Sequence, residues 1–206
     1  MSYIISDNKR CGVIGYGSWA TALVHTLERN KIEVWWHIRN EEILESMETE
    51  GRNAKYLSDV EFDTSLITAT SDINEVVRNC EIILIAAPSA FLAYILAELA
   101  EPLDNKFILS ATKGIIEEEY RTITEYFKSK YGLHYTNLGL ISGPSHAEEV
   151  SRNKLSYLTV ACKSEENAKL IGEMFKSKDL KVTHSQDIYG IEYAAILKNI
   201  YALAGG

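Results

Sequence analysis

Apolar runs of strand length alternate with segments of helical periodicity along most of this 206-residue chain. Such alternation is typical of a doubly wound α/β sheet, in which helices connect parallel strands. The runs EIILIAAP and KFILSAT are continuously apolar, as expected of strands that helices cover on both faces. Six further strands are expected at CGVIGY, IEVWWHI, LITATS, LGLISGP, YLTVAC and KVTHS. The predicted fold is therefore a doubly wound, mostly parallel sheet.

Helical spacing marks five segments between these strands, which we expect at residues 18–30, 41–50, 89–100, 117–130 and 164–178. The last segment, YGIEYAAILKNIYALAGG, departs from the alternation, because it is long, rich in alanine and followed by no strand. We predict that residues 1–188 form the α/β domain and that residues 189–206 form the first helix of a truncated, all-helical second domain.

A glycine-rich turn, Gly15-Tyr16-Gly17-Ser18-Trp19-Ala20, directly follows the first apolar strand and opens a helix. In this context a Gly-x-Gly-x-x-Gly/Ala pattern binds the pyrophosphate of a dinucleotide. Gly15 allows the tight turn, and Gly17 lets backbone N–H groups approach the phosphates. Ser18 lies at the helix N-terminus, where partial positive charge favours an anion. The pattern predicts a Rossmann-type dinucleotide-binding domain, although alone it also fits a turn without ligand.

The end of the second predicted strand bears on the choice between NAD and NADP. A site for NAD usually carries an acidic residue there, which binds the ribose hydroxyls. This chain instead reads WWHIRN, with no acid before Glu41, and Arg39 can hydrogen-bond to a 2′-phosphate. NADP is therefore favoured over NAD as the cofactor. A solvated surface charge is the alternative interpretation of Arg39.

Three further strands end in small or polar residues, at Pro88-Ser89, Lys113-Gly114 and Gly143-Pro144-Ser145. Ligands bind beyond the carboxyl ends of the strands in open parallel sheets, although each of these ends also fits an ordinary turn. Lys113 is expected at this edge, where its ammonium group can pair with a phosphate or orient a substrate oxygen. Ser145 is expected to cap the next helix with Glu148 as its capping-box partner. His146 is interpreted as a packed or surface residue rather than a catalytic base.

Lys198 falls on the apolar stripe of the last predicted helix, together with Ile191, Ala195 and Ala202. Burial there would lower the pKa of the lysine and let it exchange protons near neutral pH. The alternative is a lysine whose ammonium group extends past the stripe into water.

The composition argues against several classes of protein. With a net charge of −8 the chain lacks the basic surface of a general nucleic-acid binder, although local positive charge can still bind an anionic substrate. No apolar run reaches the roughly 18 residues of a membrane span, and the N-terminus does not resemble a signal peptide. The cysteines and histidines show neither disulfide nor metal-ligand spacing, so we expect no metal and a cytoplasmic location.

In order and spacing, the segments GYGSWATAL, NAKYL, APS, ATKG, SGPSHAEEV and LKNIYALAGG resemble bacterial NAD(P)-dependent glycerol-3-phosphate dehydrogenases. The ordered set, which covers nearly the whole chain, is more specific than any one segment. The resemblance implies an oxidoreductase that interconverts sn-glycerol 3-phosphate and dihydroxyacetone phosphate by hydride transfer, for glycerophospholipid synthesis. That family places its active site between an N-terminal dinucleotide-binding domain and a C-terminal helical domain. Because most of the second domain is missing from the sequence, little activity is expected of this chain.

Matched motif by motif, the resemblance implies catalytic roles for Lys198 and Lys113. It implies cofactor contacts from Gly15, Gly17, Ser18, Trp19, Arg39, Tyr56, Lys113 and Ala147, and substrate contacts from Lys113, Gly143, Ser145 and Lys198. In the oxidative direction, neutral Lys198 would take the proton of the C2 hydroxyl as hydride leaves for the nicotinamide, and Lys113 would position the same oxygen. The implied partners are NADP or NAD, the phosphorylated substrate and, as a candidate assembly, a second copy of the chain in a homodimer.

Two other functions stay open at this point. A related dehydrogenase for 2-hydroxyacids or sugar acids would share the fold and a helical-domain lysine. A non-catalytic dinucleotide-binding module would need only the glycine-rich turn. A serine hydrolase is disfavoured, because GYGSWA is not a Gly-x-Ser-x-Gly nucleophile elbow.

Overall fold

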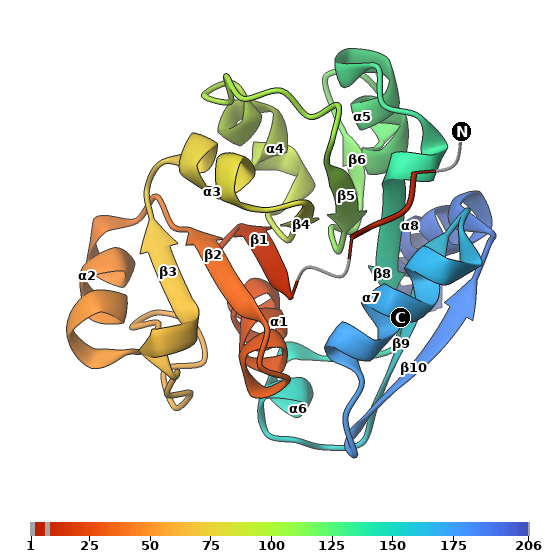
Figure 1. Cartoon of the computed structure of the whole chain (residues 1–206). Coiled ribbons are helices and arrows are strands. Elements are labelled where there is room, and N and C mark those ends of the chain that lie inside the picture. Colours follow the sequence, from red (N-terminus) through yellow and green to blue (C-terminus); the bar gives the residue numbers. More distant parts are fainter. Residues whose placement is uncertain (1–2, 7–8, 206) are drawn as a thin grey trace.

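The structure, a computed structural model, describes residues 3–6 and 9–205, with the side chains at positions 199, 200 and 202 left aside. Its main sheet has eight strands in the order β10-β9-β8-β5-β4-β1-β2-β3 (Figure 1). The strands are β1 Arg10–Ile14, β2 Glu33–His37, β3 Ile67–Thr70, β4 Ile82–Ile85, β5 Phe107–Ser110, β8 Leu138–Ser142, β9 Ser156–Cys162 and β10 Leu180–Ser185. The eight strands expected from the sequence are all present.

Neighbouring strands in this sheet run parallel, except that β8 and β9 pair antiparallel. The chain builds one side of the sheet from β1 to β3, then crosses back and builds the other side from β4 onward. The prediction of a doubly wound, mostly parallel, Rossmann-type sheet is confirmed. Its strand order reverses between β1 and β4, which is where such sheets bind ligands.

Helices cover both faces of the sheet, because the central strands carry apolar side chains on both faces. In β4, Ile82 and Leu84 belong to one hydrophobic core, whereas Ile83 and Ile85 belong to the other. The first core is closed by α1 Ser18–Arg29, α2 Glu41–Glu50, α6 Ala147–Ser151 and α7 Glu165–Phe175. The second is closed by α3 Ile73–Asn79, α4 Ser89–Leu96 and α5 Ile123–Tyr131. The continuous apolar runs are thus explained by helices that pack on both faces of the strands, as the sequence indicates.

The helix predicted at residues 117–130 is wrong in its first part. That part forms the turn and second strand of a small hairpin of β6 Ile115–Ile116 and β7 Arg121–Thr122, and α5 begins only at Ile123. Thr122 caps α5 in a capping box with Glu125, and Tyr120 adopts a left-handed backbone conformation with φ of 53°. Such a conformation is incompatible with continuing a right-handed helix. The short helix α3 was not expected at all.

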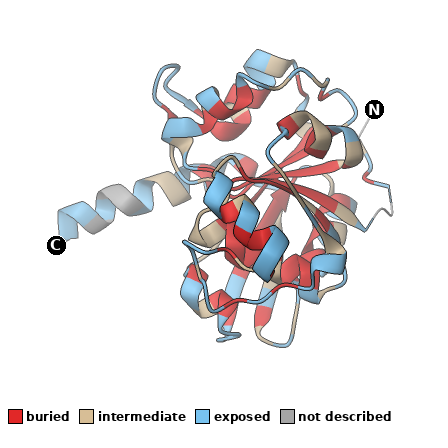
Figure 2. Cartoon of the chain, turned by 90° about the vertical axis from the view of Figure 1, so that its left-hand side faces the viewer, coloured by how far each residue is buried: buried red, intermediate tan, exposed pale blue. Residues whose placement is uncertain are grey.

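The last helix, α8 Ile188–Gly205, packs against the sheet only at its beginning. Ile188 and Ile191 lie against Leu140 and Ala161, in a small separate apolar cluster. Beyond this base α8 projects from the rest of the chain and carries exposed residues (Figure 2). That α8 opens a second domain stays a prediction. Within the described ranges, neither α8 nor another helix is long and apolar enough to cross a membrane.

Candidate functional site

The turn between β1 and α1 has the geometry of an anion-binding loop. Gly15 adopts φ of +118°, and a Cβ atom there would lie 2.6 Å from the backbone of Ala86, so only glycine fits. At Gly17, by contrast, a Cβ atom would meet nothing within 4 Å. No side chain caps the start of α1, and its first turn holds no acidic residue. The first N–H groups of the helix therefore face open space without a competing acceptor.

Two buried side chains hold this glycine-rich turn in place. The indole Nε1 of Trp36, in β2, donates a hydrogen bond of 2.7 Å to the carbonyl oxygen of Gly15. The Asn53 amide nitrogen donates to the carbonyl oxygen of Tyr16 and to the hydroxyl of Thr21, both at 2.9 Å. Because these anchors come from different segments, the conformation of the turn is fixed by the fold around it.

The same asparagine connects the turn to the segment Asn53–Leu57. Asn53 is fully buried, and its Oδ1 accepts hydrogen bonds from the backbone N–H groups of Lys55 and Tyr56, both at 3.1 Å. Tyr56, a predicted cofactor contact, therefore follows the residue that anchors the turn, with its side chain partly exposed. The sequence pointed to this segment only through the family resemblance and did not single out Asn53.

A cavity of about 380 Å³ opens in front of the turn, at the carboxyl ends of four parallel strands. Three residues from each strand end line it: Gly17, Ser18, Trp19, Ala86, Ala87, Pro88, Ala111, Thr112, Lys113, Ser145, His146 and Ala147. The structure thus brings together six of the predicted site residues, Gly17, Ser18, Trp19, Lys113, Ser145 and Ala147. Gly15 lies beneath them, against the backbone of Ala86.

The unpaired polar groups of this cavity fit part of a dinucleotide. The indole Nε1 of Trp19 is buried and has no hydrogen-bond partner, so a ligand acceptor would satisfy it. The uncapped helix N-terminus and the space at Gly17 fit a pyrophosphate. The volume lies within the range of pockets that take small organic ligands.

A second cavity of about 210 Å³ adjoins the first and contains the two lysines. Its lining comes from the ends of β5 and β8, from the middle of β9 and from α8: Lys113, Ser142, Gly143, Pro144, Thr159, Ile191, Ala194, Ala195 and Lys198. Lys113 lines both cavities, and Lys198 lines the second one with it. The structure therefore brings Lys113, Gly143 and Lys198 together, as the sequence predicts.

The two lysines differ in their surroundings. Lys198 is exposed, so the structure matches the interpretation in which its ammonium group extends past the apolar stripe into water. The reason is that α8 contacts the sheet only near its start, and Ile191 and Ala195 on the same face are themselves only half-buried. The side chain of Ala202 lies outside the described residues. Lys113 is also exposed overall, yet partial desolvation of its ammonium group, followed by repulsion from Lys198, lowers the pKa of Lys113.

Ser145 does not form the expected capping box. Its hydroxyl donates to the carbonyl oxygen of Tyr157 at 2.7 Å and accepts from the N–H of Tyr157 at 3.2 Å. The N-cap of α6 is instead His146, which is exposed and makes no side-chain cap bond. A Cβ atom at Gly143 would lie 2.3 Å from the same Tyr157 carbonyl oxygen. The loop after β8 is therefore fitted tightly onto the start of β9, which sets the position of Ser145 and Ala147.

Arg39 lies apart from the two cavities, beyond the end of β2. Its guanidinium carbon sits 4.9 Å from the ring centre of Tyr94, in α4, and its Nε is buried without a partner. His37 is buried beside it. Burial, with a further contribution from the Arg39 cation, lowers the pKa of His37 to about 4. The imidazole is therefore neutral at pH 7, and Arg39 carries the positive charge at this strand end.

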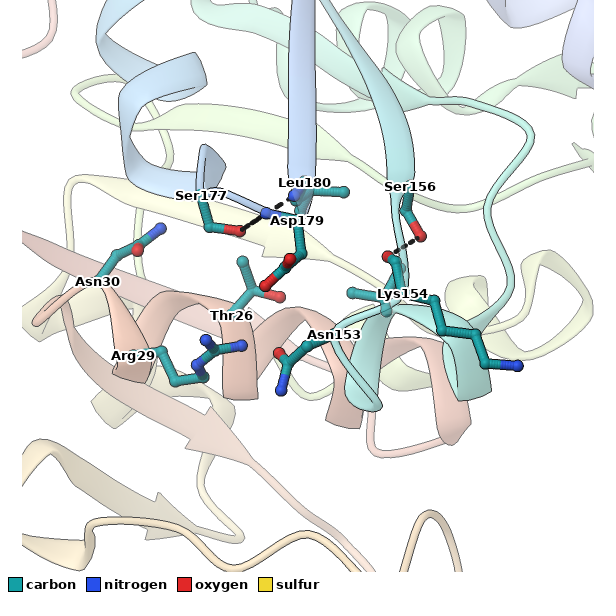
Figure 3. A pocket seen from close by; sticks show the side chains of 10 residues that line it. Thr26, Arg29, Asn30, Asn153, Lys154, Ser156, Ser177, Asp179 and Leu180 are labelled. Carbon is teal, nitrogen blue, oxygen red and sulfur yellow. Dashed lines mark hydrogen bonds between the residues drawn. The ribbon is translucent and has the colours of Figure 1, made fainter.

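A smaller hollow lies elsewhere, between the C-terminal end of α1 and the turns before β9 and β10 (Figure 3). Its volume is about 10 Å³, which leaves space for a single water molecule. None of the predicted site residues lines it. In the described part of the chain no group of His, Cys, Asp and Glu residues could hold a metal ion. Cys11, Cys80 and Cys162 are buried free thiols.

The sequence did not single out four residues whose hydrogen bonds hold the surrounding segments in place: Trp36, Asn53, Thr112 and Glu192. Trp36 and Asn53 anchor the glycine-rich turn, as described above. The Thr112 hydroxyl, at the end of β5, donates to the carbonyl oxygens of Ile85 and Ala87 and so ties the β5 end to the β4 end. Glu192, buried near the base of α8, accepts from the backbone N–H and hydroxyl of Thr124 at the start of α5. The sequence signal for Glu192 was a carboxylate among the apolar residues in the first part of α8.

Taken together, the strand order and the glycine-rich turn define a Rossmann-type domain with a ligand site at its switch point. The family model described as NAD-dependent glycerol-3-phosphate dehydrogenase N-terminus matches residues 10–168, and the chain belongs to this family.

Curated relatives and solved structures agree with this assignment. The chain is 33% identical over 202 residues to a glycerol-3-phosphate dehydrogenase [NAD(P)+] of Leuconostoc mesenteroides, covering 96% of this chain and 60% of the relative. It is 34% identical over 201 residues to the enzyme of that name from Oceanobacillus iheyensis, covering 96% and 57%. The crystal structure of glycerol-3-phosphate dehydrogenase from Coxiella burnetii superposes with a TM-score of 0.85 at 26% identity, covering 97% of this chain and 60% of that one. The chain thus spans about 60% of the length of the relatives it matches.

Proposed function

We propose that this chain is the cofactor-binding part of an NAD(P)-dependent glycerol-3-phosphate dehydrogenase, which interconverts sn-glycerol 3-phosphate and dihydroxyacetone phosphate. The observation that carries the proposal is the position of Lys113, which lines both the cavity in front of the glycine-rich turn and the cavity that contains Lys198. One amine is thereby shared between a space suited to a dinucleotide and a space suited to a small anionic substrate. The relatives named above are dehydrogenases of this activity.

In this proposal the chain's own groups bind and orient the cofactor. The N–H groups at the start of α1 hold the pyrophosphate, Gly17 leaves room for it, and Trp19 donates its free indole N–H. Ala147 and Ser145, fixed by the contact of their loop with β9, line the same cavity. Arg39 takes the adenosine end, with Tyr56 as a further neighbour. The bound nicotinamide supplies or accepts the hydride.

The two lysines act on the substrate. Lys113 and Lys198 lie on one small cavity, so a phosphorylated three-carbon compound placed there would meet two cations. In the oxidative direction, the neutral amine of Lys198 takes the proton of the C2 hydroxyl as the C2 hydride leaves. In the reductive direction, its ammonium form returns that proton to the C2 oxygen. Lys113 orients the same oxygen or the phosphate, while Gly143 brings the backbone close to the substrate.

The remaining parts of the proposal concern the whole protein. We propose residues 1–188 as the cofactor domain and residues 189–206 as the first helix of a helical substrate domain, in a cytoplasmic enzyme of phospholipid synthesis that forms a homodimer. The charge of Arg39 supports NADP over NAD. The exposed apolar side chains on α8, such as Leu197 and Leu203, support a further element packed on this helix. Because Lys198 is exposed, we expect little turnover from this chain.

The direct test is a titration of the chain with NADPH and with NADH, followed by nicotinamide fluorescence. Saturable binding that Lys113→Gln weakens, and that Lys181→Gln leaves unchanged, is the expected result. Lys181 is the matched control because it is exposed in β10, away from both cavities. Absence of saturable binding by either dinucleotide would refute the proposed function.

A further inference from the structure

The contact between Arg39 and Tyr94 joins segments that follow the two strands flanking β1. Arg39 lies just beyond β2, and Tyr94 lies in α4, the helix that begins after β4. Both β2 and β4 pair with β1, whose end carries the glycine-rich turn. With 4.9 Å between the guanidinium carbon and the ring centre, the pair has the geometry of a cation–π contact.

Arg39 takes part in no ion pair in the described part of the chain. The ion pairs found there use other arginines, namely Arg10, Arg52, Arg78, Arg121 and Arg152. The Nε of Arg39 is buried and has no hydrogen-bond partner. Among the described residues, the guanidinium group thus contacts the ring of Tyr94 and forms no ion pair, so its charge is available to a ligand.

Tyr94 is one of two exposed aromatic residues of α4, the other being Phe91. The side chain of Tyr94 is 65% exposed, whereas Leu92, Ile95 and Leu96 of the same helix are buried in the core. The ring of Tyr94 is therefore not part of the hydrophobic core. It contacts the guanidinium group of Arg39 instead. A flat guanidinium group held in place binds a phosphate through two parallel hydrogen bonds better than a freely moving one.

We propose that Tyr94 is a specificity-determining residue, which positions the Arg39 guanidinium group to bind the 2′-phosphate of NADP. This inference rests on the proposed function, because it assumes that the adenosine end of a dinucleotide lies beside Arg39. It assigns to Tyr94 no contact with the reacting atoms. Tyr94 acts through Arg39 and sets the preference for a ligand with a phosphate on its adenosine ribose over one without it.

NADPH and NADH are the probes, because they differ only by the 2′-phosphate. We expect Tyr94→Ala to weaken NADPH binding by about two- to fivefold, the size of an exposed cation–π contact, and to change NADH binding much less. Tyr94→Phe keeps the ring and should keep the affinity ratio. Phe91→Ala is the matched control, since Phe91 is a 58% exposed aromatic residue of the same helix. It should change neither affinity.

A double-mutant cycle separates positioning from a general loosening of α4. In an Arg39→Ala background, Tyr94→Ala should have no further effect on NADPH binding. An additive effect there, an equal loss of NADPH and NADH affinity, or a Tyr94→Phe variant as weak as Tyr94→Ala would overturn the inference. If the parent chain binds both dinucleotides but Tyr94→Ala leaves their ratio unchanged, the inference alone fails. If the parent chain binds neither, the proposed function fails with it.

Discussion

Trp36 and Gly15 are joined by a hydrogen bond of 2.7 Å from the indole Nε1 to the glycine carbonyl oxygen, across 21 residues of sequence. Trp36 is fully buried, so this bond is shielded from water. It connects the strand β2 to the turn that faces the cavity of about 380 Å³. The conformation of the proposed phosphate-binding turn therefore depends on a buried side chain of the neighbouring strand.

Replacing Trp36 with phenylalanine should both destabilise the fold and weaken dinucleotide binding. The substitution leaves the Gly15 carbonyl group buried without a donor, which costs about 1–3 kcal/mol in the free energy of unfolding. Urea unfolding and NADPH titration measure the two effects. Trp35→Phe is the control, because Trp35 points to the opposite face of the sheet and packs on the second core. Equal losses of NADPH affinity in both variants would argue against a role for the Trp36 bond.

Asn53→Ala should be more harmful than a change at a neighbouring exposed residue. Asn53 donates two hydrogen bonds to the glycine-rich turn and α1 and accepts two from its own segment. Losing them all in a buried position should lower the free energy of unfolding by about 2–4 kcal/mol. Lys55→Ala, which removes an exposed ion pair with Glu42, should cost less than about 1 kcal/mol. Chemical denaturation of both variants makes the comparison, and similar losses would contradict it.

The two glycines of the turn should respond differently to alanine. Gly15→Ala requires a strained backbone and places Cβ 2.6 Å from the backbone of Ala86, so this variant should be strongly destabilised. Gly17→Ala meets open space and should keep its thermal stability. Because that space is where the pyrophosphate would lie, Gly17→Ala should nevertheless bind NADPH at least tenfold more weakly. A Gly17→Ala variant with unchanged affinity would place the phosphates elsewhere.

The sequence predicted the sheet well, because continuous apolar strands are a local property. It failed where structure depends on particular polar contacts. The helix expected from residue 117 begins at Ile123, since the Thr122–Glu125 capping box and the turn at Tyr120 decide where it starts. Ser145 was expected to cap α6, but its hydroxyl bonds to the backbone of Tyr157 in β9, a strand whose antiparallel pairing with β8 the spacing did not indicate.

For the site, the sequence identified residues at strand ends but not the contacts behind them. Lys113 and Gly143 line a common cavity because they follow β5 and β8, which are adjacent in the sheet. The alternation of strands and helices predicts both strands, but their adjacency is known only from the strand order. The anchors Trp36 and Asn53 left no periodic signal, since each acts through one side chain aimed at a distant backbone group. For Lys198, helical spacing left both a buried and a solvent-exposed side chain open, because spacing does not say what packs against the helix.

His37 should make the protein sensitive to acid between pH 6.5 and 4. Its pKa is lowered to about 4, chiefly by burial, so the folded state holds the neutral imidazole while the unfolded chain binds a proton near pH 6.5. The stability is therefore complete above pH 6.5 and falls as the pH drops through this window, by about 3 kcal/mol at pH 4. In His37→Leu the slope of unfolding free energy against pH should decrease. His146→Leu, at an exposed histidine, is the control, and an equally large change of slope there would contradict the assignment.

Lys198→Gln should raise the pKa of Lys113 towards its ordinary value. Repulsion from Lys198 is one of the two causes that lower it, and desolvation, the larger one, remains in the variant. The shift can be measured by NMR of selectively labelled lysine side chains, with Lys154→Gln, at the distant small hollow, as the control.

Because the pKa of Lys113 is lower in the folded state, its ammonium form opposes folding at pH 7, and this penalty is relieved as the pH rises through that pKa towards 10.5. Lys113→Met should accordingly raise the melting temperature at pH 7 while it weakens NADPH binding. A lower melting temperature would contradict the folding penalty, and a Lys113 resonance that Lys198→Gln leaves unmoved would contradict the repulsion between the two amines.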